Sequence, residues 1–484
     1  MEATACPVAC PPASPAVAPV RPAAPAELTE ALLRQFDAPG PRYTSYPTAD
    51  RFGSAFGPGD AATALDALAA SDPAMAQPVS VYVHIPFCEQ LCYYCACNKI
   101  ITKHHERAAE YLDHLEIELG LVGARIGHGR PVSQLHFGGG SPTFLSDDEL
   151  ARVMAALRGV FTLQPDAEVS IEVDPRTVTA ARLAHFRTLG FNRLSFGVQD
   201  FDADVQQAVH RVQSLDMVRG LMVAARELGY VSINADLIYG LPRQTPESFT
   251  RTIAQMVELR PDRLAMYAYA HLPTRFKPQR RIHDAELPPP GDRIAMLGGA
   301  LAALQTSGYD YIGMDHFALP DDALAVAKRE GRLHRNFQGY STQSDRDLVA
   351  LGVSSIGQVA GQFYQNDKTL PGYYEALQAG RLPVVRGYAT TADDRLRREV
   401  IMAVMCQGRV DYAAVEARHG IDFAATFATE LAELQAMAGA GLVRLQPQGL
   451  EVTAAGWYLV RAIAMVFDRH LRASQDRARF SKVV

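Results

Sequence analysis

The stretch VSVYVHIPFCEQLCYYCACN, residues 79–98, decides how the rest of the chain is interpreted. An alternating apolar run ends at Pro86, and four of the seven cysteines of the chain follow closely: Cys88, Cys92, Cys95 and Cys97. Thiolates are soft metal ligands. Such a density of them, in a chain otherwise poor in cysteine, predicts a zinc site, an iron–sulfur cluster or a redox pair.

The spacing of the cysteines helps to choose among these sites. Cys88, Cys92 and Cys95 form a Cys-x3-Cys-x2-Cys pattern, which differs from the Cys-x2-Cys-x2-Cys run of bacterial ferredoxins. Zinc sites usually combine two close pairs from separate segments, and no second pair follows in the sequence. Three thiolates on one loop can hold three irons of a four-iron cluster and leave the fourth iron open, which favours catalysis. A zinc knot built from all four cysteines is the alternative.

The composition is that of an ordinary globular protein. With 484 residues, of which 48% are hydrophobic, the chain can bury a large core, and its length suggests two or three domains. The net charge of -6 gives no electrostatic reason to expect nucleic acid or an anionic membrane as a partner. The cysteines do not form a disulfide framework and the N-terminus lacks a signal peptide, so we expect a cytoplasmic protein. We also expect a monomer.

The chain divides into four predicted regions. Residues 1–26 are rich in proline and alanine, so we expect a disordered tail. Residues 27–78 contain RYTSYP at residues 42–47 and are expected to pack on the body that follows. Residues 79–384 form the main α/β domain, and residues 385–484 form a helical C-terminal domain.

Strand-like and helix-like segments alternate in the main domain, which predicts a parallel sheet covered by helices. The strand-like segments are short and rich in β-branched, leucine or aromatic residues. The expected strands span residues 79–85, 134–137, 169–173, 193–198, 232–239, 263–270 and 309–314, and the expected helices span residues 106–123, 147–160, 180–189, 216–228 and 245–259.

Polar and glycine-rich residues lie at the carboxyl ends of these strands. The cysteine loop follows the first strand, GGG at residues 138–140 follows the second, Glu172 lies at the end of the third and Gln199 follows the fourth. Parallel α/β sheets place their functional sites at this edge. One rim of the sheet is therefore expected to collect the chemistry.

The C-terminal domain shows a different pattern. Thr391 and Asp394 are spaced as a capping box, which opens a helix to about residue 406. A second helix is expected over residues 423–438, a hairpin over residues 442–452 and a last helix over residues 454–471. This order predicts a mostly helical, winged-helix-like domain. Because residues 423–438 contain no Lys or Arg, we expect it to serve in packing or as a lid and not in DNA binding.

Further motifs accompany the cysteine pattern in a fixed order. They are RYTSYP at residues 42–47, HIPFC at 84–88, GGGSPT at 138–143, EVDP at 172–175, GVQD at 197–200, DLIYGLP at 236–242 and IGMDHF at 312–317. Together with Tyr94 before the third cysteine and the additional Cys97, this set resembles the oxygen-independent coproporphyrinogen III oxidases, within the radical S-adenosylmethionine (SAM) enzymes. The resemblance covers roughly residues 40–484. Ser141 stands where the family usually has threonine, and it keeps the hydroxyl group.

The resemblance implies a partial (β/α)6 barrel of parallel strands and an oxidoreductase, a coproporphyrinogen dehydrogenase. Its reaction would turn two propionates of coproporphyrinogen III into vinyl groups, giving protoporphyrinogen IX in haem (porphyrin) biosynthesis. A [4Fe-4S] cluster with one open iron would bind SAM. One electron, from an unidentified donor, would then yield a 5′-deoxyadenosyl radical that takes a hydrogen atom from the propionate.

The resemblance also implies roles for individual residues. Cys88, Cys92 and Cys95 would hold the cluster, and Cys97 would support catalysis without binding iron. Two SAM molecules would lie side by side. The first would contact Tyr82, Gly139, Glu172 and Ile356, and the second would contact Tyr94, Gly140, Ser141, Gln199, Arg211, Asp236 and Ala270.

Plainer interpretations exist for these residues and for the whole chain. Taken alone, the glycines could form a tight turn, the carboxylates could cap helices, Arg211 could be solvated, and Ala270 and Ile356 could simply pack in the core. A haem-binding chaperone related to these oxidases and a radical methyltransferase are the alternative functions. The four carboxylates of the substrate call for a basic cluster, for which Arg42, Lys99, Lys103 and Arg335 are candidates.

Overall fold

A computed structural model describes residues 35–36, 38–69, 77–343 and 346–473 of the chain. The tail predicted to be disordered, residues 1–26, lies outside the described residues. Within these ranges, no helix is both long enough and apolar enough to cross a membrane.

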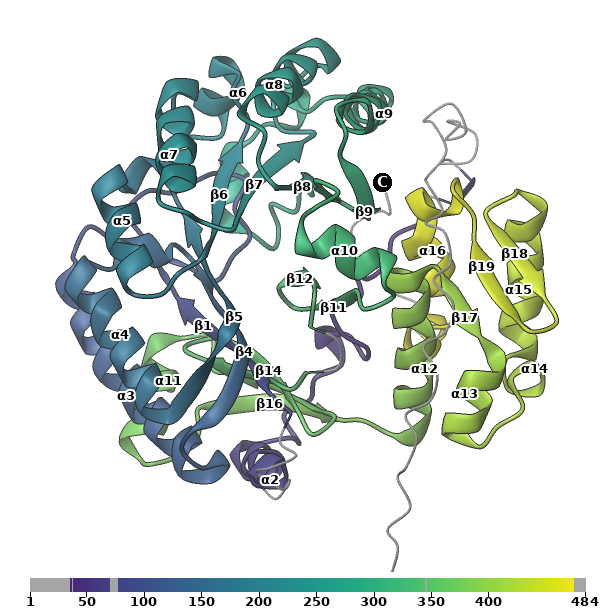
Figure 1. Cartoon of the computed structure of the whole chain (residues 1–484), viewed down its shortest axis with the longest axis horizontal. Coiled ribbons are helices and arrows are strands. Elements are labelled where there is room, and N and C mark those ends of the chain that lie inside the picture. The colour runs from purple at the N-terminus through teal and green to yellow at the C-terminus, as the bar shows by residue number, and fades with distance from the viewer. Residues whose placement is uncertain (1–34, 37, 70–76, 344–345, 474–484) are drawn as a thin grey trace, which may run out of the picture.

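A twelve-stranded sheet forms the centre of the molecule (Figure 1). Seven of its neighbouring strands run parallel, which confirms the predicted α/β class. One is the short strand β13 (Leu348–Leu351), and six are longer. The six longer strands are β1 (Val79–Ile85), β4 (Arg130–Gly139), β5 (Phe161–Val173), β6 (Arg193–Gln199), β7 (Ser232–Tyr239) and β8 (Arg263–Ala268). Figure 1 shows the sheet curling so that the helices lie outside it.

Shorter strands extend both ends of this parallel core. Next to β1 lie β13 (Leu348–Leu351), β14 (Ile356–Val359), β15 (Gln362–Asn366) and β16 (Val384–Ala389), and next to β8 lie β10 (His316–Ala318) and β9 (Asp310–Gly313). Since β16 and β9 end the strand order, the sheet is an open, partial barrel. A hairpin of β11 (His334–Asn336) and β12 (Gly339–Ser341) lies in the opening, toward the C-terminal domain (Figure 1). Strand β16 extends past residue 384, the end predicted for the main domain.

The two faces of the parallel strands differ in chemistry. Most alternate side chains on the outer face are apolar and buried, and they belong to the main hydrophobic core. The inner face is mostly polar, and its residues pair across neighbouring strands: Tyr82 with His136, Ser170 with Arg193, Glu172 with Ser195, and Asn234 with Arg263. Ile238, which pairs with Tyr267, is an apolar exception. The lumen of the barrel is therefore suited to a polar ligand.

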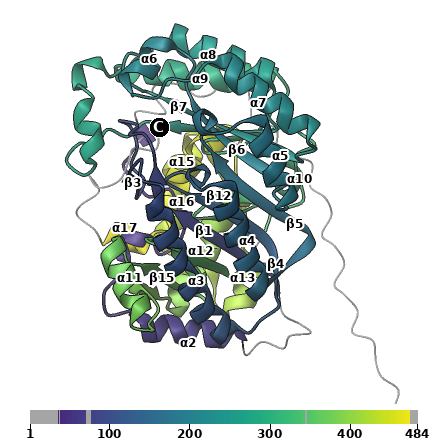
Figure 2. The ribbon, with the colours of Figure 1, turned by 90° about the vertical axis from the view of Figure 1, so that its left-hand side faces the viewer.

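Helices cover the outer face of the sheet (Figure 2). They are α3 (Glu106–Ile126), α4 (Asp147–Val160), α5 (Ala180–Thr188), α7 (Leu215–Glu227), α8 (Pro246–Leu259) and α9 (Pro290–Thr306). Several begin at a side-chain cap. Ser146 and Glu149 form a capping box at the start of α4, and Thr245 with Ser248 does the same for α8. The helix bounds lie close to those predicted.

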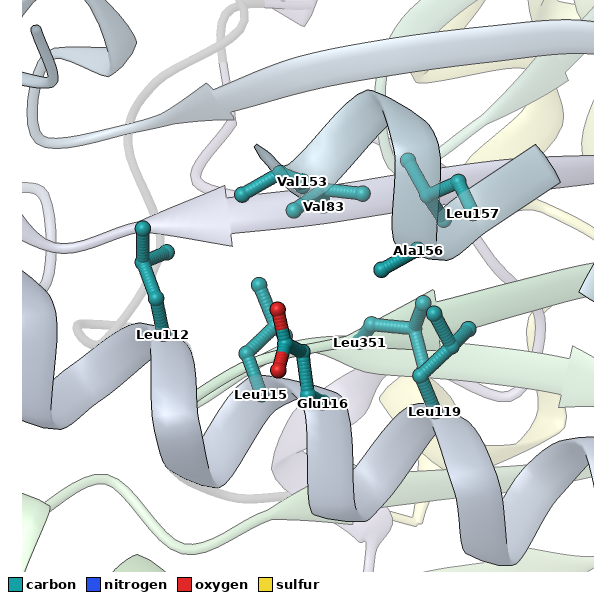
Figure 3. A pocket seen from close by; sticks show the side chains of 9 residues that line it. All are labelled: Val83, Leu112, Leu115, Glu116, Leu119, Val153, Ala156, Leu157 and Leu351. Carbon is teal, nitrogen blue, oxygen red and sulfur yellow. The ribbon is translucent and has the colours of Figure 1, made fainter. Parts of the chain in front are cut away.

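Helices α3 and α4 pack on β1 and β13 around a small apolar gap (Figure 3). Glu116 also lines the gap, and it forms an ion pair with Arg152, with Oε1 2.7 Å from Nε. The apolar lining shows that α3 and α4 pack on the sheet through contacts between hydrophobic side chains. It consists of Val83, Leu112, Leu115, Leu119, Val153, Ala156, Leu157 and Leu351.

The C-terminal domain is mostly helical, as predicted, and carries a three-stranded antiparallel sheet in the order β17, β19, β18. Its elements are α12 (Ala392–Met402), a π-helix (Ala403–Gln407), β17 (Arg409–Asp411), α13 (Tyr412–His419), α14 (Phe423–Thr426), α15 (Ala428–Gly439), β18 (Val443–Gln446), β19 (Gly449–Val452), a 3-10 helix (Gly456–Leu459), α16 (Val460–Met465) and α17 (Arg469–Arg472).

Two helix predictions in this domain were wrong. The segment 423–438 is broken at Phe427, whose ring is fully buried against Phe423 and Phe467. The segment 454–471 is broken before Asp468, which adopts an extended conformation and caps α17 with its side chain. In both places, contacts of the breaking residue override the helical pattern of the sequence.

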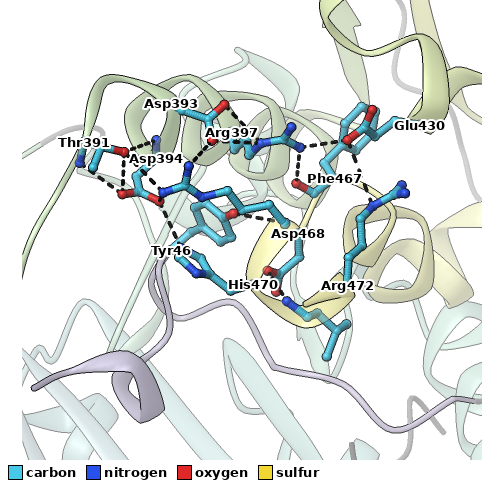
Figure 4. Close-up of polar contacts among 12 residues, drawn as sticks. Tyr46, Thr391, Asp393, Asp394, Arg397, Glu430, Phe467, Asp468, His470 and Arg472 are labelled. Carbon is cyan, nitrogen blue, oxygen red and sulfur yellow. Dashed lines mark hydrogen bonds and ion pairs between the residues drawn. The ribbon is translucent and has the colours of Figure 1, made fainter. Parts of the chain in front are cut away.

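Residues 38–47 lie against the C-terminal domain. The Tyr43 hydroxyl donates to Asp468 Oδ2 at 3.0 Å, Arg461 Nε donates to the Pro41 carbonyl at 2.9 Å, and the Arg469 amide donates to the Tyr46 hydroxyl at 3.3 Å. Figure 4 shows a neighbouring polar network around the fully buried Asp394. One oxygen of that carboxylate accepts from Arg469 and His470 and the other from Thr391. The first described segments and the last described helix therefore share one interface.

Candidate active site

The cysteines lie on a loop closed at its base by two short strands. After β1, strand β2 (Phe87–Cys88) pairs with β3 (Ile100–Ile101). The Ile100 amide donates to the Pro86 carbonyl at 2.7 Å, and the Thr102 amide donates to the Cys88 carbonyl at 2.9 Å. The loop between these strands carries Cys92, Cys95 and Cys97, and all four cysteines are free thiols. The loop thus presents them at the carboxyl end of β1.

The thiols of this loop influence one another. Burial, followed by the charges of Cys95 and Cys92, raises the pKa of Cys88 to about 12. A hydrogen bond from the Cys97 thiol is the main cause that lowers the pKa of Cys95 to about 6. In the part of the chain that the structure describes, no three His, Cys, Asp or Glu side chains converge as a single metal ion would require. The thiols of this loop are therefore not gathered around one point.

The glycine motif packs directly on the base of the cysteine loop. The Gly140 amide donates to the Ile85 carbonyl at 2.8 Å, and the Ser141 amide donates to the Phe87 carbonyl at 2.9 Å. A Cβ atom on Gly140 would lie 2.6 Å from the Pro86 oxygen, so no larger residue fits there without a backbone shift. The motif therefore connects two strand ends and is more than a tight turn.

Tyr82, Gly139 and Glu172, three of the residues expected around the first SAM molecule, lie together. The Gly139 amide donates to Glu172 Oε2 at 3.2 Å, and Glu172 Oε1 lies 3.6 Å from His136 Nε2. The Tyr82 ring stacks on His136, and its hydroxyl is hydrogen bonded to His84 Nδ1 at 3.1 Å. The Glu172 side chain remains 44% exposed, so it faces the open lumen. Neither histidine was assigned a role from the sequence.

Arg211 is buried and is not a solvated surface charge. It forms an ion pair with Asp174, with Nη2 3.3 Å from Oδ1, and its Nη1 donates to Cys92 Sγ at 3.6 Å. A Cβ atom on Gly197 would lie 3.0 Å from both Arg211 Nη2 and Gln199 Nε2. The side chains of these two predicted residues therefore both pack against Gly197. The structure thus brings Arg211 and Gln199 to the cysteine loop.

Tyr94 and Ala270 are joined through Gln279. Its Nε2 donates to the Tyr94 carbonyl at 2.9 Å and to the Ala270 carbonyl at 3.2 Å. Ile356 begins β14, which the sheet order separates from β1 by β13 alone. Its partner across β14 and β15 is Gln365.

Asp236 lies on the inner face of β7. It accepts hydrogen bonds from Ser195 Oγ at 3.2 Å and Asn234 Nδ2 at 2.9 Å. Burial, followed by the charge of Glu172, raises the pKa of Asp236 to about 7. The two carboxylates are therefore electrostatically coupled across the lumen, and Asp236 is not a helix cap.

Sequence reasoning missed two residues of the site, Asp174 and Arg176. Arg176 Nη2 donates to Cys92 Sγ at 3.7 Å, its Nη1 donates to Gln90 Oε1 at 3.0 Å, and it forms an ion pair with Asp174 at 2.6 Å. Asp174 thus holds two arginines that both reach Cys92. The EVDP motif followed by Arg176 was the available signal, but nothing in it showed that the side chains turn toward the cysteines.

The chain resembles curated proteins over almost its whole length. It is 49% identical to the oxygen-independent coproporphyrinogen III oxidase of Pseudomonas aeruginosa over 455 residues, which cover 94% of this chain and 98% of the relative. The relative of the same name from Synechocystis is 39% identical, with 95% and 98% of the two chains covered. The chain belongs to the oxygen-independent coproporphyrinogen III oxidases. It is therefore a radical SAM oxidoreductase.

Family models and a solved structure agree with this membership. The Radical SAM superfamily matches residues 82–256, and the HemN C-terminal domain matches residues 390–459. The structure described as "Coproporphyrinogen III oxidase (HemN) from Escherichia coli is a Radical SAM enzyme" has a TM-score of 0.86 and 48% identity, and the match covers 91% of this chain and 98% of that one. The radical SAM barrel expected from the sequence is thus confirmed.

A [4Fe-4S] cluster and SAM are the cofactors that this superfamily implies. The donor set of the oxidase fits the cluster, because three free cysteines share one loop and two arginine side chains donate to one of the sulfurs. Hydrogen bonds of this kind stabilise a thiolate ligand. The neighbouring glycines leave the backbone approachable, and the carboxylates of Glu172 and Asp236 lie on the same inner face and can accept hydrogen bonds.

Proposed function

We propose that the chain converts two propionate side chains of coproporphyrinogen III to vinyl groups and so forms protoporphyrinogen IX. The observation that supports this most directly is the convergence of the cysteine loop, the glycine motif and two coupled carboxylates at one rim of a polar barrel lumen. The names of close relatives point to the same substrate.

We further propose that Cys88, Cys92 and Cys95 hold the cluster and that two SAM molecules bind in the lumen. When bound, the cluster and SAM supply the radical chemistry. Tyr82, Gly139 and Glu172 would orient the first SAM molecule, and Ile356 would close its site. The residues around Arg211 and Asp236 would bind the second, since a guanidinium group suits a carboxylate and a carboxylate suits an amino group or hydroxyls. They comprise Tyr94, Gly140, Ser141, Gln199, Arg211, Asp236 and Ala270.

Cys97 is proposed to support the reaction without binding iron. Its thiol donates a hydrogen bond to Cys95, and this bond lowers the pKa of Cys95. Cys97 would thereby help to keep Cys95 in the thiolate form that an iron ligand requires.

The remaining proposals concern partners. The reaction needs a one-electron donor, which is still to be identified. The net charge of -6 disfavours nucleic acid as a partner. A monomeric state and a cytoplasmic location complete the proposal, and size-exclusion chromatography and cell fractionation test them.

An anaerobic assay tests the proposed function. The iron-loaded protein is incubated with SAM, a reductant and coproporphyrinogen III, while protoporphyrinogen IX and 5′-deoxyadenosine are both measured. We expect wild type to form both products and Cys97→Ser to lose protoporphyrinogen formation while it retains iron. Cys406→Ala, a change of a buried cysteine in the C-terminal domain, serves as the control. If wild type binds haem but leaves coproporphyrinogen III unchanged, the haem-chaperone alternative replaces this proposal.

A further inference from the structure

Arg335, on strand β11, is a buried cation with an unsatisfied donor. The residue is 2% exposed, and its Nη1 has no hydrogen-bond partner. Within the described ranges, no carboxylate lies within ion-pair distance of its guanidinium group, which distinguishes it from the ion-paired arginines Arg193, Arg211 and Arg263. A buried charge without a counter-ion is costly, so it suggests a site that is completed by an anionic ligand.

Arg42 brings a second guanidinium group to the same place. It comes from the N-terminal segment, where the neighbouring Tyr43 is fully buried against the C-terminal domain, whereas the Arg42 side chain is 31% exposed. Arg335 Nε donates to the Arg42 carbonyl at 3.1 Å. Burial, followed by the like charge of Arg335, lowers the pKa of Arg42 to about 10, so Arg42 remains charged at neutral pH.

Among the described residues, one carboxylate lies within ion-pair distance of either arginine. Asp315 forms an ion pair with Arg42 through Nη2, so the cluster keeps an excess of one positive charge. His316 contributes no further charge near neutral pH, because burial and then the charges of Arg335 and Arg42 hold its pKa well below the usual range. The cluster therefore has the charge to accept one carboxylate.

Aromatic rings form the walls of this cluster. The guanidinium carbon of Arg42 lies 5.5 Å from the centre of the Tyr267 ring, and that of Arg335 lies 4.6 Å from the centre of the Tyr340 ring. A ring beneath a guanidinium group restrains the plane of that group and leaves its N–H edge free to bind a carboxylate in a bidentate way. The site combines flat apolar surfaces with cationic edges, as a large ring that carries acidic side chains requires.

The cluster faces the same lumen as the site proposed for SAM. Tyr267 pairs with Ile238 across β8 and β7, two positions beyond the pair of Ala265 and Asp236 on the same face. Tyr267 therefore follows Asp236 along the inner face, and the Arg42 guanidinium lies over its ring. A substrate could thus contact the arginines while its other end reaches the reacting region.

We infer that Arg42 and Arg335 together bind a propionate carboxylate of the macrocyclic substrate. This inference rests on the proposed function, because the established family name alone does not say which residues recognise the substrate. Of the four basic candidates, Lys99 lies elsewhere, since its Nζ donates to the Cys95 carbonyl at 3.1 Å. Arg42 and Arg335 are separated by almost three hundred residues, so only the fold brings them together.

The test compares variants of the iron-loaded full-length enzyme in the presence of SAM. Arg335→Met, Arg335→Lys and Arg42→Lys are assayed for turnover of coproporphyrinogen III and for binding of coproporphyrin III, a redox-stable probe with the same propionates. Its tetramethyl ester is the uncharged control ligand. Arg332→Gln, a change of a half-exposed arginine three residues from Arg335, is the control variant.

We expect the KM of Arg335→Met and its dissociation constant for coproporphyrin III to rise about 10- to 100-fold, with a small change in kcat. Arg335→Lys should recover part of the affinity, and the ester should bind wild type and variants alike. Without ligand, Arg335→Met should be at least as thermally stable as wild type, because an uncompensated buried charge has been removed.

Three outcomes would overturn the inference. The first is an unchanged affinity for coproporphyrin III in Arg335→Met and Arg42→Lys, and the second is a loss of affinity for the tetramethyl ester as large as that for coproporphyrin III. The third is a large loss of thermal stability without ligand that accounts for the lost binding. Failure of the proposed function gives a different result. In that case wild type would leave coproporphyrinogen III unchanged, whereas arginine-dependent binding of coproporphyrin III would still support the site.

Discussion

At the scale of single residues, the charges around Cys92 are the feature that distinguishes this loop from four ordinary thiols. Arg176 and Arg211 both donate to Cys92 Sγ, and Asp174 holds both guanidinium groups in place. Donors to a ligand sulfur stabilise the more negative, reduced form of an iron–sulfur cluster. Arg176 is therefore expected to set the reduction potential and not to bind SAM.

Replacing Arg176 tests this expectation. Arg176→Gln should lower the midpoint potential of the cluster by roughly 50–100 mV, if the lost hydrogen bond to a charged sulfur contributes about 1.5–2.5 kcal/mol. A redox titration followed by electron paramagnetic resonance measures the potential, and iron content confirms loading. Arg219→Gln, on the exposed side of α7, is the control. An unchanged potential at full iron content would contradict the prediction.

Glu118 provides a pH-dependent contribution to stability. Its carboxylate accepts from Tyr373 at 2.6 Å, Gly352 at 2.7 Å and Asn366 at 2.6 Å, yet burial raises its pKa to about 7. The unfolded pKa is about 4.3. Because the folded pKa is the higher one, the folded state holds the proton more tightly, and the associated stability is lost as pH rises from about 4.3 through 7.

Glu118→Gln should therefore flatten the dependence of the free energy of unfolding on pH. Between pH 5 and pH 8, deprotonation of Glu118 is expected to lower the free energy of unfolding of wild type by up to about 3 kcal/mol. Urea denaturation at several pH values measures it. Asp236 has a raised pKa as well and adds a slope of the same sign, so the comparison is between variant and wild type at each pH. Identical slopes in the two proteins would refute the assignment to Glu118.

At the scale of the elements, the sequence patterns were informative where a segment is buried in a regular way. Strands β1 and β7 and helix α4 have the predicted bounds, because their apolar periodicity and caps report burial directly. The short strands at the sheet ends have three to six residues of ordinary composition, and their pairing depends on distant partners. The breaks at Phe427 and before Asp468 depend on tertiary contacts in the same way.

The residues of the candidate site also divide into those that sequence motifs reveal and those that only the folded chain brings together. The three cysteines proposed to hold the cluster, together with Glu172 and Asp236, belong to motifs with fixed spacing, so they could be named from the sequence. The arginines of the further site could be named only as candidates, because residues 42 and 335 meet through folding alone. Arg176 was missed since an arginine after a turn is usually solvated, and only the structure shows it turned toward Cys92.

The α3–α4 layer allows a direct test of packing. Leu115 is 4% exposed and lines the gap in Figure 3, so Leu115→Ala should lower the free energy of unfolding by about 2–4 kcal/mol. Denaturant titration measures the loss. Ile117→Ala, on the exposed face of the same helix, should cost much less, because Ile117 is 41% exposed. Equal losses in the two variants would show that this layer is not the core contact described.

At the scale of the whole molecule, the N-terminal segment connects the barrel with the C-terminal domain. Arg42 faces the barrel, while the flanking Tyr43 and residues 40–41 bond to Asp468 and Arg461. This arrangement gives the C-terminal domain a positioning role, because it holds the segment from which Arg42 projects.

Tyr43→Phe should weaken this connection. The change leaves the buried Asp468 without one donor, so the free energy of unfolding should fall by about 1–3 kcal/mol, and the KM for coproporphyrinogen III should rise as Arg42 loses its support. Tyr374→Phe is a matched control, because the Tyr374 hydroxyl is buried without a hydrogen-bond partner and should be dispensable. Equal effects of the two substitutions would contradict this account.

The contacts between residues 40–46 and residues 461–469 also set a time order for biosynthesis. A ribosome adds about 5–20 residues each second, so the early segment waits at least 20 s for its partners. During that interval a nascent barrel can already contain the whole cysteine loop, but Arg42 has no fixed position. The substrate chamber is then completed only by the last part of the chain, and a prematurely terminated polypeptide would carry the radical-forming loop without the means to hold its substrate.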